Sequence, residues 1–508
     1  MPIIKSPVSW YLKRRISQIE EFMNNPHEVQ LKWFHSLVEK AANTEWGRKY
    51  DYSSINTPEE YRQRVPVSNY EVFKHYIERL QKGEQNLLWP SKIRWFAKSS
   101  GTTANKSKFI PVSREAITDC HFKGGKDLLS IYFNNNPDAQ LLGGKILGLS
   151  GSLLPVGNNG NDSFSGDISA VLLKNLPVWI SKNRVPHQSL ALLEDWELKI
   201  EKVSKAVINE DVRNLTGAPS WMLLLMKKVL EISGKTNLSE VWPRLELFVH
   251  GGMNFEPYRK QFENITPANM NYMDAYNASE GFFAVQDRPQ HDDLLLFLDH
   301  GIYYEFVPLD ELNNEYPKSL TLGEVQKDIV YALVISTNAG LWRYLIGDTV
   351  RFTDIAPYRI KIAGRTKNFI NAVGEELMID NAEKAISIAC ERTGAVLSEF
   401  TAAPVYFQEN ENAAHEWIIE FEKEPDDMKS FSQILDTELK KLNSDYEAKR
   451  YNNMILREPI IHSAPEGTFY LWLKSKGKLG GQNKVPRLSN NRNILDEIAN
   501  IMNKRTES

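Results

Sequence analysis

Cysteine is scarce in this chain of 508 residues, which contains only Cys120 and Cys390. The two are far apart and lack the short spacing of a redox or zinc pair, and none of the ten histidines falls in a His-Glu-x-x-His pattern. The sequence therefore gives no support to a catalytic zinc or to a cysteine–histidine pair. Cys390 lies on the apolar face of a predicted helix, so we expect it to be buried in a core.

Long apolar runs are also absent. The longest, such as 221–226 and 330–335, have the length of core elements and are too short to span a bilayer. The N-terminus mixes Trp10 with the basic residues 13–15 and lacks the apolar stretch of a secretory signal. Such a mixture could touch a membrane, but a helix packed on the domain is the simpler interpretation. We expect a cytoplasmic protein with no membrane partner.

Charge of one sign is not in excess. The formal net charge is -4, which creates no field that would attract a nucleic-acid backbone, and no recognition motif is present. A DNA-binding regulator is thus disfavoured. The length exceeds what one hydrophobic core usually supports, so we expect two or three domains with a site in a cleft between them.

The order of predicted elements indicates an α/β protein. The segment up to Lys82 is predicted to be helical, with breaks at Pro58 and Pro66. From Ile93 onward, strands alternate with helices, which is typical of a mostly parallel sheet whose sites lie at the carboxyl ends of the strands. The predicted elements are strands 141–149 and 245–249 and helices 190–207 and 221–232.

From Leu294 the chain becomes rich in strands, at 294–298, 303–307 and 330–336, which predicts a β subdomain attached to the α/β core. Beyond residue 367 we predict a small α+β unit, with a helix capped by Asp380 and Glu383 and ended by Gly394, strands 395–401, 417–422 and around 454–456, and a helix from Met428 to Leu442. The resulting prediction is a large N-terminal domain, 1–366, and a mobile C-terminal domain, 367–508, with a hinge near 364–368.

One polar loop between two apolar segments has the composition of a loop that binds a polyphosphate. It contains the hydroxyl, glycine and lysine residues Ser99, Ser100, Gly101, Thr102, Thr103, Lys106 and Lys108. Backbone N–H groups in a tight turn point at phosphate oxygens, hydroxyls add neutral donors and a lysine adds a point charge. The same residues also form ordinary surface turns, and the spacing is not that of a P-loop NTPase. Whether this loop binds phosphate is therefore judged from the motifs found elsewhere in the chain.

Three further segments could complete a nucleotide site. The strand 271–278 leads to Glu280, and one carboxylate suffices for Mg²⁺, which also takes phosphate oxygens as ligands. Asp348 follows an aromatic strand and Gly347, and could accept hydrogen bonds from ribose hydroxyls. The lysine-rich loop 474–487 could bring a lysine to an α-phosphate. Taken singly, an exposed strand end, a turn and a solvated loop explain these segments as well.

Taken together and in order, these motifs resemble the adenylate-forming enzymes. They are Ser99-Ser100-Gly101-Thr102 through Lys108, Tyr276-x-x-Ser279-Glu280 and Tyr344-x-Ile346-Gly347-Asp348. The details, including Gln482-Asn483-Lys484-Val485-Pro486-Arg487, are most similar to the Gretchen Hagen family of acyl acid amido synthetases. The resemblance spans nearly the whole chain and implies an ATP-dependent ligase of the firefly-luciferase-like fold.

The resemblance also implies roles for individual residues. Ser99, Ser100, Gly101, Thr102, Thr103 and Lys108 would hold the phosphates, Tyr276 and Ser279 would line the nucleotide pocket, Glu280 would meet Mg²⁺, Asp348 would bind the ribose, and Lys484 would assist adenylation. Arg365 lies where the hinge is expected and would be positional. Three positions depart from the family pattern. Asn105 stands where the family has a glycine, Leu345 where it has an arginine, and Asn483 where it has a tyrosine. The neighbouring Arg343 could compensate for the missing arginine.

The resulting prediction is a monomeric ligase that adenylates a small carboxylic acid with ATP and Mg²⁺ and then transfers the acyl group to an amine of an amino acid. The alternatives are transfer to coenzyme A and a non-catalytic nucleotide-binding protein. The acid itself is not predicted. Gly251, Gly252 and Met253 follow a strand and could border its pocket, although a strand-to-helix turn explains them equally well.

Overall fold

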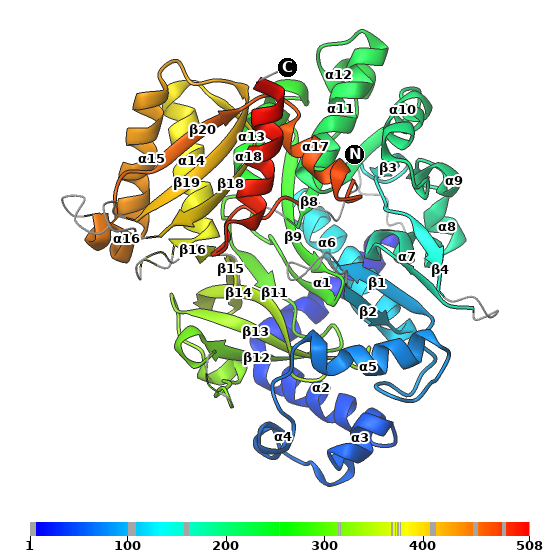
Figure 1. Cartoon of the computed structure of the whole chain (residues 1–508). Coiled ribbons are helices and arrows are strands. Elements are labelled where there is room, and N and C mark those ends of the chain that lie inside the picture. The colour runs from blue at the N-terminus through cyan, green and yellow to red at the C-terminus, as the bar shows by residue number, and fades with distance from the viewer. Residues whose placement is uncertain are drawn as a thin grey trace. The chain divides into compact units, whose positions relative to one another are not determined.

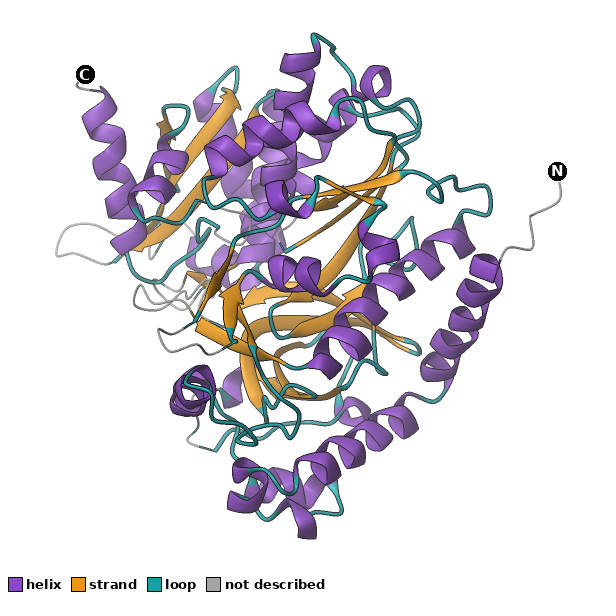
Figure 2. Cartoon of the chain, turned by 90° about the vertical axis from the view of Figure 1, so that its right-hand side faces the viewer, coloured by secondary structure: helices purple, strands orange, loops and turns teal. Residues whose placement is uncertain are grey.

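The structure, a computed structural model, describes residues 7–99, 108–156, 162–252, 255–312, 314, 316–366, 369–370, 372, 375, 377–406, 413–450, 456–479 and 484–506. Figure 1 follows the chain from its N-terminus to its C-terminus, and Figure 2 shows helices lying along the strands. Two compact units divide the chain. The first comprises residues 1–252, 266–346 and 350–361, and the second 253–265, 347–349 and 362–508.

The first unit begins with helices, as the sequence predicts. They are α1 (Pro7–Asn24), α2 (Pro26–Ala41), α3 (Glu45–Lys49), the 3-10 turn η1 (Tyr52–Ser54), α4 (Pro58–Arg64) and α5 (Tyr70–Gln81). Pro58 occupies the first turn of α4, where its missing N–H costs nothing, and Thr57 with Glu60 forms a capping box before it. Pro66 follows the end of that helix. None of the described helices has the length and apolarity that crossing a bilayer requires.

A mixed sheet of eleven strands forms the centre of the first unit, in the order β12-β13-β14-β15-β11-β10-β9-β8-β7-β3-β6. Its parallel part is β6-β3-β7-β8-β9, and β10 and β11 continue it in antiparallel fashion. The strands are β3 (Lys145–Gly148), β6 (Arg184–Val185), β7 (Val212–Gly217), β8 (Leu247–Gly251), β9 (Asn271–Ala278), β10 (Gly281–Val285), β11 (Leu294–Leu296), β12 (Ile302–Pro308), β13 (Val330–Thr337), β14 (Tyr344–Ile355) and β15 (Tyr358–Arg365).

The strands predicted at 141–149, 245–249, 294–298, 303–307 and 330–336 are confirmed as β3, β8, β11, β12 and β13. Strands β11 to β15 are hydrogen-bonded into the same sheet as the parallel strands. The mixed α/β fold class is therefore confirmed.

Helices and a smaller sheet complete the first unit. The helices are the π-helix η2 (Ala116–His121), α6 (Phe122–Asn135), α7 (Ile168–Asn175), α8 (Val178–Ser181), α9 (Gln188–Ala191), α10 (Trp196–Val207), α11 (Pro219–Ser233) and α12 (Leu238–Val241), with short 3-10 turns η3 (Leu309–Glu311) and η4 (Leu322–Glu324). The smaller sheet has the order β2-β1-β5-β4, with β1 (Trp95–Ser99), β2 (Lys108–Val112), β4 (Leu153–Pro155) and β5 (Phe164–Gly166).

The second unit contains a three-stranded sheet, β18-β19-β20, covered on both faces by helices (Figure 1). Trp417 and Ile419 on β19 pack with α14 and α15, whereas Ile418 between them packs with α17 and α18. This alternation follows from the two-residue period of a strand. The elements are α13 (Glu256–Ile265), β16 (Phe369–Ile370), β17 (Leu377–Met378), α14 (Ile379–Thr393), β18 (Val396–Val405), β19 (Ala414–Lys423), α15 (Met428–Leu442), α16 (Ser444–Arg450), β20 (Ile460–Ala464), α17 (Thr468–Ser475) and α18 (Asn493–Thr506).

The predicted cap of α14 is wrong. Asp380 lies inside the first turn of the helix, and the N–H of Met378 is instead accepted by the Asn381 side chain at 3.3 Å. The carboxylate of Glu383 is paired with Arg487 at 2.9 Å. Gly394 ends the helix as predicted, and Cys390 is buried as predicted. Of the strand expected around 454–456, residues 451–455 lie outside the described residues, and Leu456 forms an isolated bridge to Ala413.

Two neighbouring glycines in α6 provide a matched test of how tightly this helix packs. A methyl group on Gly124 would lie 2.4 Å from the ring of Phe282, whereas a methyl group on Gly125 would meet nothing within 4 Å. We expect Gly125→Ala to raise the free energy of unfolding by about 0.5–1 kcal/mol, because alanine loses less backbone entropy in a helix. We expect Gly124→Ala to lower it by about 1–3 kcal/mol through overpacking. Urea unfolding of both variants measures the difference, and equal effects would contradict this packing.

Candidate active site

The β9–β10 hairpin carries three of the predicted site residues. Ala278 pairs with Gly281, so Ser279 and Glu280 form the two-residue turn between the strands. Gly251, the last residue of β8, pairs with Ala275 on β9, so the turn lies beyond the carboxyl end of β8 (Figure 1 labels both strands). Ligands of open α/β sheets bind at this edge. The hairpin therefore presents a carboxylate where the fold class places ligands.

Tyr276 and Ser279 are buried, and Glu280 is partly buried. The ring of Tyr276 lies 4.8 Å from that of Phe283, centroid to centroid, and belongs to the hydrophobic core of the first unit. Tyr276 is thus packed into the core, whereas Glu280 at the turn is partly exposed to solvent.

The π-helix η2 contacts both strands of the hairpin. The pairing register of β10 shifts between Phe282 and Ala284, which marks a bulge. The Phe282 N–H donates to Cys120 Sγ at 3.2 Å, and the His121 Nδ1 lies 3.1 Å from Asn277 Oδ1 on the opposite strand. π-Helical turns often occur at functional sites because they redirect side chains. Here the turn directs two consecutive side chains onto both strands of the hairpin.

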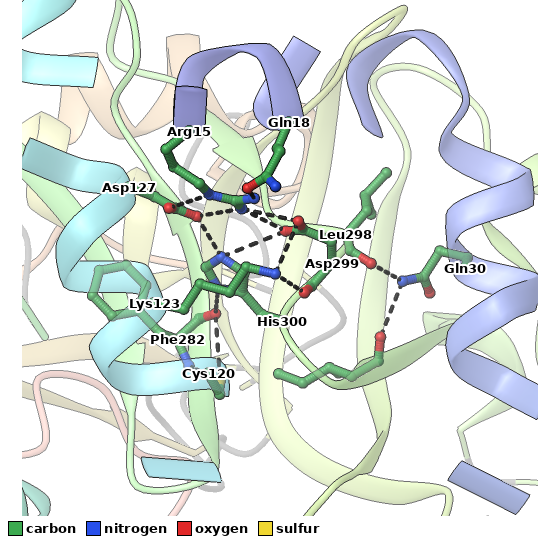
Figure 3. Close-up of polar contacts among 11 residues, drawn as sticks. Arg15, Gln18, Gln30, Cys120, Lys123, Asp127, Phe282, Leu298, Asp299 and His300 are labelled. Carbon is green, nitrogen blue, oxygen red and sulfur yellow. Dashed lines mark hydrogen bonds and ion pairs between the residues drawn. The ribbon is translucent and has the colours of Figure 1, made fainter. Parts of the chain in front are cut away.

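A buried ionic network holds the Phe282 carbonyl group (Figure 3). His300 Nδ1 lies 3.3 Å from the Phe282 carbonyl oxygen, and His300 Nε2 lies 2.7 Å from Asp127 Oδ2. The guanidinium of Arg15 donates to both carboxylate oxygens of Asp127, at 2.5 and 2.7 Å. Helices α1 and α6 are thereby connected to the peptide group two residues after Glu280.

Asp127, Asp299 and His300 have ligand atoms within 4.8 Å of one another, a spacing that a metal ion could use. Arg15, however, also donates to Asp299 at 2.9 Å, and Lys123 Nζ lies 2.9 Å from the same carboxylate. Two fixed cations therefore already neutralise both carboxylates. We interpret the cluster as an ion-pair network, and it lends no support to a metal site.

Burial keeps both side chains of η2 uncharged at neutral pH. It lowers the pKa of His121 from 6.5 to about 4, partly offset by the hydrogen bond to Asn277. It raises the pKa of the Cys120 thiol to about 12. The side chains of η2 that contact the hairpin are therefore neutral. A neutral thiol can accept the hydrogen bond from Phe282, and it excludes Cys120 as a thiolate nucleophile.

The predicted phosphate loop connects two paired strands. Ser99 at the end of β1 pairs with Lys108 at the start of β2, while Ser100, Gly101, Thr102, Thr103 and the divergent Asn105 lie outside the described residues. Lys108 Nζ lies 5.7 Å from the centre of the Tyr70 ring, and the Tyr70 hydroxyl accepts a hydrogen bond from Phe109 N–H at 2.9 Å. Helix α5 therefore supports one base of this loop.

Three other predicted residues belong to the second unit or its boundary. Asp348 lies on β14 directly after Gly347, whose carbonyl group accepts a hydrogen bond from Thr366 N–H at 2.8 Å. Arg365 ends β15, and its side chain is outside the described part, as is Met253. Asp348 and the backbone of Arg365 are therefore neighbours. The hinge at 364–368 remains a prediction.

Lys484 is exposed, and the segment that follows it is firmly anchored. The buried guanidinium of Arg487 lies 2.9 Å from Glu383 and donates to the Tyr258 hydroxyl at 3.0 Å. Main-chain hydrogen bonds join Ala402 on β18 to Arg487 and Ser489. The arginine of the predicted C-terminal motif thus holds the segment that carries the lysine.

Arg343 does not replace the missing family arginine at position 345. Its guanidinium is buried, pairs with Glu305 at 3.0 Å and donates to the carbonyl oxygens of Arg62 and Val65. Arg343 is therefore committed to the fold. Sequence reasoning also missed the residues that grip the hairpin, namely Arg15, Cys120, His121, Asp127 and His300, because they are far apart in the chain and form no local motif.

Family models match three consecutive parts of the chain. The GH3 family N-terminal domain matches residues 15–270, the central domain residues 295–365 and the C-terminal domain residues 380–493. The chain belongs to the GH3 family. This result confirms the family resemblance that the ordered motifs indicated.

Named relatives of this GH3 chain match most of its length. An indole-3-acetic acid-amido synthetase, GH3.3 of Arabidopsis thaliana, is 21% identical over 96% of the chain and 93% of the relative. A jasmonoyl–L-amino acid synthetase, JAR4 of Nicotiana attenuata, is 22% identical over 78% of the chain and 79% of the relative.

Solved structures show the same fold. The GH3.15 acyl acid amido synthetase has a TM-score of 0.78 at 18% identity and covers 99% of this chain and 97% of its own. A 2-hydroxyisobutyryl-CoA ligase in complex with an acyl-AMP has a TM-score of 0.60 at 11% identity and covers 94% and 91%. The GH3 chain thus has the fold of the adenylate-forming ligases.

His121 makes the stability of the first unit sensitive to acid. The unfolded chain protonates His121 near pH 6.5, whereas the folded chain resists protonation until about pH 4. Stability should therefore fall as the pH drops from about 6.5 to about 4, by up to about 3 kcal/mol. In His121→Gln, whose amide can still donate to Asn277, this loss should be absent. Urea midpoints between pH 4.5 and 7.5 measure both slopes, and parallel slopes would contradict the assignment.

Proposed function

We propose that this GH3 chain is an acyl acid amido synthetase that activates a small carboxylic acid with ATP and transfers it to the amine of an amino acid. In the first step a carboxylate oxygen attacks the α-phosphorus of ATP, giving the acyl adenylate and pyrophosphate. In the second step the amine nitrogen attacks the acyl carbon, the bond to AMP breaks, and the amine loses a proton to solvent. Activation is needed because a carboxylate is a poor electrophile.

Family membership is the observation that carries this proposal. The matched domains cover most of the chain, and the relatives named above are amido synthetases of indole-3-acetic acid and jasmonate. Membership identifies the chain as an enzyme of the ligase class. The acyl-AMP bound in a protein of the same fold supports adenylation as the first step.

The hydroxyls and amides of the loop after Ser99, with Lys108, are proposed to hold the triphosphate. Tyr276 and Ser279 form a wall of the nucleotide pocket, and Asp348 accepts hydrogen bonds from the ribose hydroxyls. Glu280 fits a Mg²⁺ ion because it offers a single partly buried carboxylate at the ligand-binding edge of the sheet. The ion would neutralise charge on the phosphates. Lys484 stabilises the negative charge that develops at the α-phosphate.

The acyl acid is proposed to lie at the end of β8, beside Gly251, Gly252 and Met253. The acid itself is not identified by these residues. Transfer to coenzyme A is the rival second step, because a CoA ligase shares the fold, although with the lower TM-score.

Carboxylate-dependent ATP–pyrophosphate exchange tests the first step. We expect exchange with at least one member of a panel of aryl, indole and aliphatic acids. Adding amino acids or coenzyme A to the preformed adenylate then separates the two second steps by product mass. A thioester product would refute the amido assignment, and exchange with no acid would refute adenylation.

Lys484→Ala should lower the exchange rate about 100-fold or more, because a charge aimed at the developing transition state is lost. ATP binding, measured by calorimetry, should persist. Lys478→Ala in the same C-terminal segment is the matched control and should keep the wild-type rate. If Lys484→Ala behaves like this control, the chain binds nucleotide without using Lys484, as a non-catalytic protein would.

Glu280→Gln should raise the Mg²⁺ concentration needed for half-maximal exchange about tenfold, because the neutral amide is a weaker ligand of a hard cation. A Mg²⁺ titration of the exchange rate measures the shift. Glu391→Gln, on α14, is a control for loss of one acidic charge. An unchanged Mg²⁺ requirement in Glu280→Gln would remove Glu280 from the metal site.

A further inference from the structure

His300 lies on the loop between β11 and β12, and helix α2 holds both ends of this loop. The side-chain amide of Gln30 donates to the carbonyl oxygens of Leu298 at 2.8 Å and Ile302 at 3.0 Å, one on each side of His300 (Figure 3). The imidazole is fully buried, and the centre of its ring lies 4.3 Å from that of Phe297. Hydrogen bonds thus hold the loop, and packing holds the ring.

Both ring nitrogens of His300 face an acceptor. Nε2 lies 2.7 Å from Asp127 Oδ2, and Nδ1 lies 3.3 Å from the carbonyl oxygen of Phe282. A neutral imidazole has one N–H and one lone pair, so either tautomer would turn a lone pair toward a carboxylate or a carbonyl oxygen. Only the doubly protonated ring can donate to both acceptors at once. The contacts therefore indicate an imidazolium.

The charges next to the ring favour the same form. Arg15 donates to Asp127 and to Asp299, and His300 Nε2 lies 3.7 Å from Asp299 in addition to its contact with Asp127. Burial alone would raise the pKa of Asp127, but the hydrogen bonds from His300 and Arg15 outweigh it, so this pKa lies below its ordinary value. If His300 is protonated, each carboxylate contacts two cations and the group of four is neutral. An unbalanced charge would be costly here, because the Arg15 side chain is 2% exposed and those of Asp127 and His300 are fully buried.

Three other groups lie near this group of four. Lys123 Nζ lies 2.9 Å from Asp299 and adds one positive charge, but its side chain is 23% exposed, so water compensates part of that charge. On η2, His121 and Cys120 are neutral at neutral pH, because burial lowers the pKa of the imidazole and raises that of the thiol. The charge that is not balanced within the cluster is therefore the one that reaches solvent.

The carbonyl group that His300 contacts lies at the bulge of the β9–β10 hairpin. The pairing register shifts between Phe282 and Ala284, and a bulge locally redirects a strand and its side chains. Cys120 Sγ accepts the Phe282 N–H at 3.2 Å, so this residue is bonded at its N–H and at its carbonyl group. Glu280 precedes it by only two residues. The two bonds therefore orient the backbone next to the turn.

We propose that His300 carries a proton on both ring nitrogens in the folded enzyme and acts as a positioning residue for Glu280. As an imidazolium it donates to the Phe282 carbonyl group and so orients the turn that offers its carboxylate to Mg²⁺. The role toward Mg²⁺ rests on the proposed function, whereas the protonation state does not. An imidazolium has no lone pair for a metal ion, which agrees with the interpretation of the cluster as an ion-pair network.

Nitrogen-15 NMR of the full chain, labelled at histidine, measures the protonation without turnover. The two nitrogens of a neutral ring differ widely in chemical shift, whereas those of an imidazolium are similar. At about pH 7.5, where an ordinary histidine with a pKa of about 6.5 is mostly neutral, we expect the imidazolium pattern for His300. Contacts with the ring of Phe297 assign its signals, and His121 provides the neutral pattern in the same spectrum. A lone-pair nitrogen at His300 under these conditions would overturn the proposal.

Two amide variants of His300 separate its two hydrogen bonds. The amide nitrogen of asparagine can take the place of Nδ1 and still donate to Phe282, whereas that of the longer glutamine can take the place of Nε2 and donate to Asp127. Each variant loses one hydrogen bond and the positive charge, so a general loss of stability affects both. His300→Gln should raise the Mg²⁺ concentration needed for half-maximal pyrophosphate exchange about fivefold, as the loss of one hydrogen bond predicts. His300→Asn should stay within about twofold of the wild type.

Equal shifts of the Mg²⁺ requirement in the two variants, or no shift in His300→Gln, would overturn the positioning role. The NMR measurement uses the wild type and needs no turnover, so it decides on the imidazolium independently of the variants. A wild type that catalyses no exchange with any acid would refute adenylation, while the NMR result would still decide on His300.

Discussion

The buried carboxylate of Asp127 is the constraint on which the β9–β10 hairpin depends. It lies between the guanidinium of Arg15 and the ring of His300, and through His300 it reaches the carbonyl group of Phe282. Removing one partner from such a cluster leaves an uncompensated buried charge, which typically costs about 3–5 kcal/mol. The cluster therefore resists rearrangement. Because Phe282 is two residues from Glu280, the rigidity of helices α1 and α6 passes to the turn that is proposed to meet the metal.

Local periodicity and ordered motifs predicted much of this molecule. Strands such as β8 and β12 and helices such as α10 and α15 follow from apolar spacing, because each buries one face against a core. The motif Tyr276-x-x-Ser279-Glu280 predicted the turn at the end of β9. What could not be predicted depends on contacts through space. The contacts of His300 and Cys120 with Phe282 arise only once the chain has folded around the hairpin. At the start of α14, Asn381 rather than Asp380 accepts the hydrogen bond from the Met378 N–H. The commitment of Arg343 to Glu305 likewise needs the fold of β12.

The C-terminal motif combines a rigid part with an exposed part. Arg487 is buried between Glu383 and the ring of Phe400, and the residues around it are hydrogen-bonded along β18. Lys484, three residues earlier, is exposed. A lysine that stabilises charge at a transition state needs a defined position but also a long side chain with freedom to reach its target. Anchoring the backbone three residues away serves the first need, and the length of the lysine side chain serves the second. Since Arg487 fixes the backbone near Lys484 through its contacts with Glu383 and Tyr258, we expect it to act on the proposed chemistry as a positioning residue.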